Sequence, residues 1–163
     1  MKAVIQAVKN AKCTVENKVT GEIEEGLLVY FCVEKGDKES MIPQFLDKII
    51  KLRLYRDENE RANFSIMDKS RKILFISQFT LAASLKKGNR PSFDNAESPL
   101  IAEVLYNKAI AYLRDKRLEV GVGEFGAHME VSYTNMGPQT FIWELNGDNF
   151  QKNSSVFLKI ALY

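Results

Sequence analysis

The most continuously apolar run of the chain, LLVYFCV at residues 27–33, constrains the fold more than any other segment. Gly26 and Gly36 bound it, and a run of this length between glycines is typical of a strand that is covered on both faces. A second apolar run at 72–81 is interpreted as another buried strand. The chain therefore needs other elements to cover these two strands.

Two segments carry apolar residues at helical spacing. The first covers residues 42–52, with Asp37 as its candidate cap and Pro43 in or near its first turn. The second opens at Ser98-Pro99, a cap followed by a proline, and its predicted apolar stripe is Ile101, Val104, Leu105, Ala109, Tyr112 and Leu113. Shorter strand-like segments lie at 4–8, 13–15, 19–23, 52–55, 120–122, 129–133 and 140–145, with a polar loop at 57–63. This order predicts a single α+β domain with a largely antiparallel mixed sheet and two main helices.

Composition excludes several kinds of site. The chain of 163 residues fits one domain, and its net charge of +2 does not by itself indicate nucleic-acid binding. Cys13 and Cys32 lie in apolar runs without CxxC spacing, so we expect buried, reduced thiols in a cytoplasmic protein. His128 is the only histidine and no nucleotide-phosphate loop motif occurs, so we expect no metal and no cofactor. We expect neither a signal peptide nor a membrane helix, since no run approaches ~20 apolar residues.

Polar residues interrupt the second apolar run at Ser77, Gln78 and Thr80. On a strand Ser77 and Phe79 would point one way and Gln78 and Thr80 the other. Thr is a good strand former, so the segment can be purely structural, but a buried Gln78 amide needs partners. Ser77 or Thr80 could act as a nucleophile only with a base, and His128 is the one imidazole.

Gly137-Pro138 lies between two strand-like runs. A Gly-Pro peptide tolerates the cis form and glycine permits positive φ, so this pair can present its carbonyls in a fixed direction. Asn135 and Thr140 on either side could bond the turn backbone and hold it rigid. The alternative is an ordinary hairpin turn.

Two further segments favour contact with a ligand. The loop at 84–99 carries Lys86, Lys87 and Arg90, which suit phosphate contacts, and Phe93, which could stack on a base. A solvated surface loop is the alternative. The glycines around Phe125, in the GEFGA segment at 123–127, suggest a backbone approached closely by a substrate or a partner chain.

Together these segments resemble the D-aminoacyl-tRNA deacylase family of the D-tyrosyl-tRNA deacylase type. The resemblance covers about residues 1–145, and its joint order and spacing are highly specific. It rests on the motifs AVIQ at 3–6, GLLV at 26–29, VEKGD at 33–37, KIIKLR at 48–53, SQFTL at 77–81, KGNRPSF at 87–93, FGAHM at 125–129 and NMGPQT at 135–140. It implies a barrel-like version of the predicted fold at 1–146, and leaves 147–163 as an extension of unknown role.

The resemblance implies a homodimeric enzyme that edits charged tRNA in translation quality control. It would cleave the ester between a D-amino acid, or glycine mischarged on tRNA-Ala, and the 3′-terminal adenosine of tRNA. Backbone N–H groups of Ser77, Gln78, Phe79 and Thr80 would polarise the ester carbonyl, with the ribose 2′-OH assisting water. Gly137 and Pro138, in cis, would reach from one subunit into the other's pocket and exclude L-amino acids. Asn135, Thr140, Phe125 and Met129 would complete the substrate site, and Lys86, Lys87, Arg90 and Phe93 would contact tRNA.

Three positions depart from the family pattern. Ala7 stands where arginine is usual, Met136 where aspartate is, and Gln139 where valine or phenylalanine is. These departures bear on how strictly L-aminoacyl esters are rejected. Two alternative functions stay open: a nucleic-acid-binding module on the same fold without deacylase activity, and a protein hydrolase with Thr80 or Ser77 as nucleophile and His128 as base.

Overall fold

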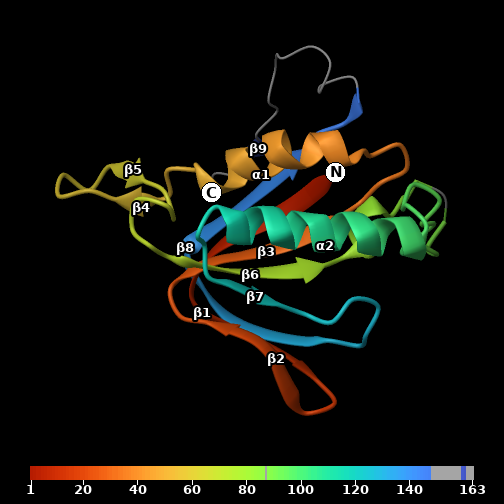
Figure 1. Ribbon diagram of the computed structural model, residues 1–163, viewed down its shortest axis with the longest axis horizontal. Helices are drawn as coiled ribbons and strands as arrows, with labels where there is room; N and C mark the ends of the chain where they lie inside the picture. Colours follow the sequence, from red (N-terminus) through yellow and green to blue (C-terminus); the bar gives the residue numbers. More distant parts are fainter. Residues whose placement is uncertain (87, 148–158, 161–163) are drawn as a thin grey trace.

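One long strand, β1 (Lys2–Val15), lies at the centre of the sheet and pairs with three other strands (Figure 1). The structure is a computed structural model that describes residues 1–86, 88–147 and 159–160. β1 pairs antiparallel with β3 (Gly26–Cys32) along its first half, with β2 (Lys18–Ile23) along its second half, and with β8 (Glu130–Glu144) on its other edge. β6 (Lys72–Ser77) and β7 (Val120–Val122) extend the sheet in parallel beyond β3, and β9 (Lys159–Ile160) pairs with β8 at the opposite end.

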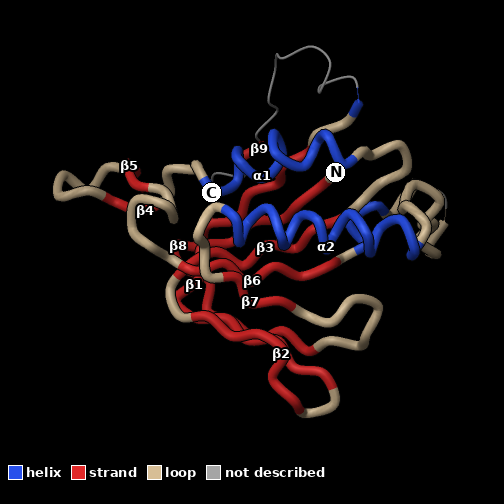
Figure 2. Tube along the Cα trace, viewed as in Figure 1, coloured by secondary structure: helices blue, strands red, loops and turns tan. Residues whose placement is uncertain are grey.

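Two helices, α1 (Ile42–Ile50) and α2 (Pro99–Asp115), lie side by side on one side of the sheet (Figure 2). Alternate side chains of β1, β3 and β6 point toward them and form the main core. A chain of aromatic contacts fills this layer: Phe31 packs on Phe45 and Phe75 at ring-centroid distances of 5.5 and 5.0 Å, and Phe45 stacks on Trp143 at 5.7 Å. β3 and β6 are buried on both faces, which explains why their sequences are continuously apolar.

The second face of β3 and β6 lines a smaller core inside a nearly closed barrel. Val8, Ala11 and Cys13 of β1 contribute to it, and the other buried members are Ile23, Leu28, Leu74 and Ile76. The barrel closes where β2 approaches β7 at Gly21. A Cβ on Gly21 would lie 2.5 Å from the Val122 carbonyl oxygen and 2.6 Å from the Val122 nitrogen, so only glycine allows this approach.

The mixed sheet, the barrel-like closure and the two helices confirm the predicted α+β class, but several predicted boundaries are wrong. The segments at 4–8 and 13–15 belong to one strand, and so do those at 129–133 and 140–145, because β1 and β8 stay paired across the irregular stretches. The strand expected at 52–55 shrinks to β4 (Tyr55–Arg56). It pairs with β5 (Ala62–Phe64), whose first residues fall in the predicted loop.

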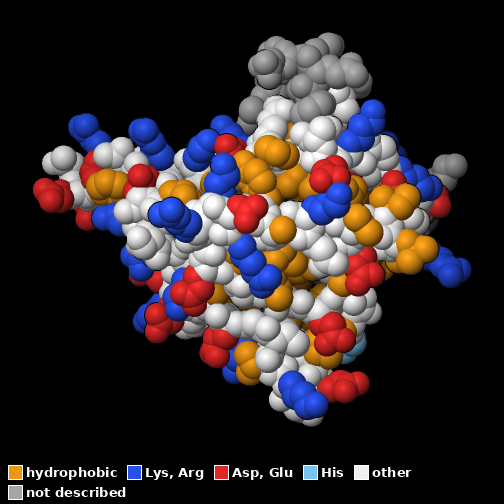
Figure 3. Space-filling model, in the orientation of Figure 1, with side chains coloured by type: hydrophobic (Ala, Val, Ile, Leu, Met, Phe, Trp, Pro, Cys, Tyr) orange, Lys and Arg blue, Asp and Glu red, His pale blue; other side chains and the backbone are white. Residues whose placement is uncertain are grey.

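The predicted stripe of α2 is partly wrong. The helix begins at Pro99 as expected, but Ile101 and Val104 are 51% and 54% exposed, while Tyr106 and Ile110 are buried. Leu100 is 81% exposed on the same turn, and Figure 3 shows hydrophobic side chains on the surface toward the right, where α2 begins.

Asp37 does not cap α1. A 3-10 turn (Glu39–Met41) precedes that helix, and the Asp37 carboxylate accepts hydrogen bonds from the backbone nitrogens of Met1 and Glu34, at 2.6 and 2.7 Å. The carboxylate thus holds the loop after β3 against the start of β1.

The predicted extension at 147–163 falls mostly outside the described residues; of it the structure describes residue 147 and β9. Within the described part of the chain, no helix is long and apolar enough to cross a membrane.

We predict that Gly21→Ala lowers the free energy of unfolding by about 1–3 kcal/mol, because the added methyl meets the backbone of Val122 and the barrel must open to admit it. Urea denaturation measures this effect. Gly147→Ala is the matched control, since a Cβ there meets nothing within 4 Å. Equal stability of the two variants would contradict the closure described above.

Candidate active site

The polar segment after β6 is a turn, which corrects the expectation of a strand through residue 81. The last ladder bond runs from the Gln78 N–H to the Phe31 carbonyl at 2.7 Å, and the chain then enters a 3-10 turn (Phe79–Ala82). The predicted alternation of side chains therefore fails after Ser77. Phe79 is 59% exposed, and Thr80 is exposed as well.

The turn presents two adjacent backbone donors. Its first N–H groups, those of Phe79 and Thr80, have no acceptor within the described residues, whereas those of Leu81 and Ala83 bond the carbonyls of Gln78 and Thr80 at 3.3 and 3.1 Å. The first N–H groups of a helical turn lack internal partners. Such a pair of donors can bind a carbonyl oxygen on which negative charge develops.

A nucleophile–base pair is not assembled here. The Gln78 amide donates to the Thr80 hydroxyl at 2.6 Å, while His128 is exposed. Among the described residues, no hydrogen bond links His128 to Ser77 or to Thr80. The same parts contain no group of three or more His, Cys, Asp or Glu side chains that could hold a metal ion.

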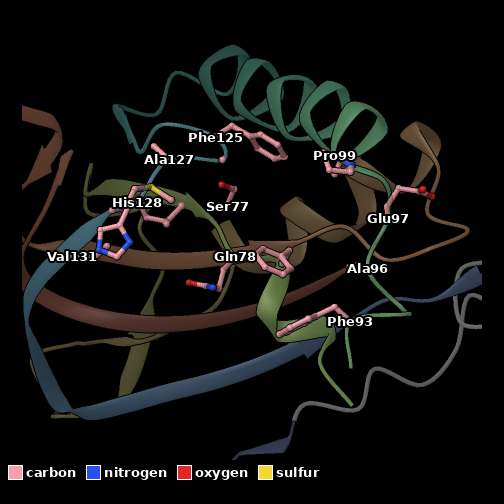
Figure 4. Close-up of a pocket in the computed structure, with 15 residues that line it drawn as sticks. Ser77, Gln78, Phe93, Ala96, Glu97, Pro99, Phe125, Ala127, His128 and Val131 are labelled. Carbon is pink, nitrogen blue, oxygen red and sulfur yellow. The ribbon is translucent and has the colours of Figure 1, made fainter. Parts of the chain in front are cut away.

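A cavity of about 540 Å³ opens beside the turn. Figure 4 shows Phe125 and Ala127 on one side of Ser77 and Gln78, and Phe93 on the other. Its walls are mostly apolar and come from the end of β6, the loop before α2, the start of α2 and the segment before β8. The lining residues that bear on the chemistry are Ser77, Gln78, Phe79, Phe93, Phe125 and Met129.

The wall of the cavity is fixed from the core. The buried Tyr106 hydroxyl donates to the Phe75 carbonyl at 2.7 Å, and its ring lies 5.8 Å from that of Phe125. Burial raises the pKa of Tyr106 well above its ordinary value, so this hydroxyl stays a donor. A Cβ on Gly123 would lie 2.4 Å from the Met129 sulfur, so the backbone at Gly123 passes close to this side chain. The close approach predicted around Gly123 and Gly126 is thus made by the chain's own Met129 at Gly123, whereas a Cβ on Gly126 would meet nothing within 4 Å in the described residues.

Two side chains that sequence reasoning missed hold the turn from beneath. The Lys2 Nζ donates to the Leu81 carbonyl at 3.3 Å and to Glu34 at 3.2 Å. The Cys32 thiol lies within donating distance of the Val33 and Phe79 carbonyls, at 3.6 and 3.7 Å, and burial raises its pKa to about 11, which keeps the proton in place. Both residues lie on neighbouring strands, far from the turn in sequence, so no local signal could have indicated them.

Gly137-Pro138 belongs to a bulge within the single strand β8, so the alternative of an ordinary hairpin turn between two strands is wrong. Gln6 pairs with Thr140 and Val8 with Asn135, so residues 136–139 of β8 stand opposite the single residue Ala7. The Gly137–Pro138 peptide is cis, and Gly137 has a φ of 116°, which favours glycine.

Asn135 closes the base of this bulge. Its Oδ1 accepts from the Gln139 N–H at 2.9 Å, and its Nδ2 donates to the Gln139 carbonyl at 3.4 Å and to Thr140 Oγ1 at 3.2 Å. The Gln6 amide donates to the same Thr140 oxygen at 3.1 Å. Asn135 thus bonds the bulge backbone as predicted, while Thr140 bonds side chains.

The structure brings together only some of the predicted site residues. Gly137, Pro138, Asn135 and Thr140 do not line the cavity. The bulge stands opposite Ala7, whereas the turn contacts Lys2, and β3 and β1 lie between β6 and β8. With about 4.8 Å between neighbouring strands and about 3.3 Å per residue along a strand, the turn and the bulge lie on the order of 20 Å apart.

Of the predicted tRNA-contacting residues in the described part of the chain, one lines the cavity and the others do not. Phe93 lines the cavity, and its ring lies 5.1 Å from that of Phe79. Lys86 and Arg90 are exposed in the same loop and do not line the cavity. Lys87 lies outside the described residues.

The turn and the bulge both contact side chains of β1 on the side of the sheet that faces away from the helices: Lys2 bonds the turn and Gln6 bonds the base of the bulge. We call this surface the open face; it includes Val4, Gln6, Tyr30, Tyr133 and Ile142. Tyr133 and Ile142 are 39% and 42% exposed. Burial, followed by the adjoining Tyr133, raises the pKa of Tyr30 to about 12, so its hydroxyl is protonated at neutral pH.

Comparison with known proteins places these features in a family. The sequence model described as D-Tyr-tRNA(Tyr) deacylase matches residues 4–144. The D-aminoacyl-tRNA deacylase of Clostridioides difficile (strain 630) is 44% identical over 142 residues, which cover 87% of this chain and 95% of that protein. The enzyme of the same name from Thermosipho africanus (strain TCF52B) is 46% identical with the same coverage. A solved structure named c-Myc DNA Unwinding Element Binding Protein has a TM-score of 0.84 and 36% identity, covering 90% of this chain and all of that one.

Proposed function

Because the chain belongs to the D-Tyr-tRNA(Tyr) deacylase family, and is by that membership a D-aminoacyl-tRNA deacylase, we propose that it hydrolyses the ester between a D-amino acid and the 3′-terminal ribose of tRNA. The observation that carries the mechanism is a pair of N–H groups without a partner in the described residues: that of Phe79, which lines the apolar cavity, and that of Thr80, which follows Phe79 in the turn and does not itself line the cavity. We expect the enzyme in the cytoplasm, where its substrate is used.

The reaction needs positioning and carbonyl polarisation more than a strong nucleophile. The two N–H groups bind the ester carbonyl oxygen as a water attacks the carbonyl carbon. The bond to the ribose oxygen then breaks, and that oxygen takes a proton, which leaves free amino acid and intact tRNA. The neighbouring ribose 2′-OH assists the water. An ester in a fixed pose needs no further activated side chain.

Chirality is selected by shape. The carbonyls of Gly137 and Pro138 occupy the space that an L side chain requires, so only a D side chain or a hydrogen fits. Glycine carries no side chain for this filter to reject, so glycyl-tRNA, including glycine mischarged on tRNA-Ala, is also a substrate.

The filter acts between subunits of a homodimer. Turn and bulge lie on the open face on the order of 20 Å apart, too far to form one site within a chain. Across a twofold interface, the bulge of one copy meets the turn of the other copy, and the same contact is repeated with the two copies exchanged. The half-exposed Tyr133 and Ile142 of the open face suit burial in such an interface.

The loop before α2 guides the tRNA end to the cavity. Lys86, Lys87 and Arg90 contact phosphates, and Phe93, whose ring packs edge-on against Phe79, stacks on the terminal adenosine. A nucleic-acid-binding module without deacylase activity is the second candidate, favoured by the name of the solved relative, which describes a DNA-binding protein.

The deciding experiment compares release of D-tyrosine, glycine and L-tyrosine from matched charged tRNAs. We expect rapid release of the first two and at least about 100-fold slower release of L-tyrosine, since a steric conflict in a rigid site costs several kcal/mol and about 1.4 kcal/mol is tenfold. Binding of tRNA without release of any amino acid would favour the nucleic-acid-binding module instead.

Two substitutions at Thr80 separate its side chain from its backbone. Thr80→Ala keeps the N–H, so we expect at least about a tenth of the wild-type kcat. Thr80→Pro removes an N–H that has no partner within the described residues and should reduce kcat by about 100-fold. Complete loss with Thr80→Ala, together with a trapped acyl-enzyme, would establish Thr80 as a nucleophile and overturn the water mechanism.

Mixed dimers test the cross-subunit site. Gly137→Val disturbs the bulge and should release L-tyrosine, while Ala127→Trp fills the cavity and should be inactive. A dimer of one chain of each kind has one intact cavity facing an intact bulge. Refolding Gly137→Val with excess Ala127→Trp should therefore restore discrimination against L. Unchanged L release from the mixture would mean that each chain builds its site alone.

A further inference from the structure

We infer that Gln6 is a positioning residue for the Gly137-Pro138 bulge, and that its amide determines how strictly this enzyme rejects L-amino acids. The inference rests on the proposed function, because it concerns the element proposed to select chirality. It adds a residue on β1 that lies outside both the turn and the bulge.

The contacts form one chain from the sheet to the bulge. The Gln6 Nε2 donates to Thr140 Oγ1 at 3.1 Å, and the same oxygen accepts from Asn135 Nδ2 at 3.2 Å. Asn135 in turn bonds the N–H and the carbonyl of Gln139, at 2.9 and 3.4 Å. We call Gln6, Thr140, Asn135 and the Gln139 backbone the amide clasp.

Gln6 is the link that fixes this clasp to a rigid strand. Its neighbours in the β1 ladder at this level are Leu28 of β3 and Thr140 of β8, so β1 is held from both sides. The next residues of β1, Ala7 and Val8, have no polar side chain to offer the bulge. Without the Gln6 amide, the other bonds of the clasp lie within β8 itself.

Two buried side-chain oxygens at the clasp, which have no hydrogen-bond partner in the described residues, also point to a role in positioning. They belong to Gln6 and Gln139. A buried acceptor without a donor destabilises a protein, and an apolar side chain of the same length would avoid that cost. The Gln6 amide is therefore poorly explained by stability and well explained by the bond that its nitrogen makes to Thr140.

The test compares Gln6→Met, which keeps the length and removes the donor, with Gln6→Glu, whose carboxylate can accept the Thr140 hydroxyl and restore the link. Gln44→Met, on α1, is the matched control. The loss of one hydrogen bond corresponds to about a three- to tenfold effect. We expect Gln6→Met to raise the ratio of L-tyrosine to D-tyrosine release by about that factor, with D release little changed, and Gln6→Glu and Gln44→Met to stay near the wild type.

A second measurement is independent of activity. By NMR, the backbone amide of Gln139, which donates to Asn135, should exchange with solvent faster in Gln6→Met than in the wild type. If Gln6→Met does not fold, Thr140→Val removes the receiving oxygen and should show the same two changes. Wild-type discrimination and wild-type exchange in these variants would overturn the inference. If the wild-type enzyme releases no amino acid, the proposed function fails, and the exchange of Gln139 alone decides the role of Gln6.

Discussion

The double pairing of β1 is the constraint on which the rest of the structure depends. Because β3 and β8 bond its two edges, β1 holds both functional segments at defined positions on one face. Lys2 near its start reaches the carbonyl of Leu81 in the turn, and Gln6, four residues later, reaches the base of the bulge. Their spacing is thereby set by strand geometry rather than by loops, and it is too long for the two to meet within one chain.

Much of the fold could be predicted from local patterns. The apolar runs of β3 and β6 and the Ser98-Pro99 start of α2 carry their own signals, and these predictions are confirmed. The failures share one cause, which is that long-range partners decide the outcome. β6 ends at Ser77: the Gln78 N–H still bonds the Phe31 carbonyl of a strand distant in sequence, and the chain then enters the 3-10 turn.

The site follows the same rule. Sequence motifs singled out both segments as candidate sites but predicted neither the turn nor the bulge. The bulge was missed because pairing with β1 on both sides of Ala7 is invisible in the sequence of β8. The contacts of Lys2, Cys32 and Gln6 with the turn and the bulge were not predicted, because each is made across the sheet. In the proposed dimer, the turn and the bulge form one site only with a second copy of the chain, which no single sequence segment specifies.

The departures at positions 7, 136 and 139 acquire a physical meaning in this setting. Ala7 is buried on the helix side of the sheet and offers nothing to the bulge, so the support comes from the other side, through the Gln6 amide. Gln139 folds against Gly137, with its Cγ 2.7 Å from the place where a Cβ of Gly137 would lie. A filter that works by exclusion depends on stiffness, because a carbonyl that can move aside excludes nothing. The side chains that bond the base of the bulge are neutral, so we expect the proposed chiral selection to depend little on ionic strength, since such bonds involve no charged group that salt could screen.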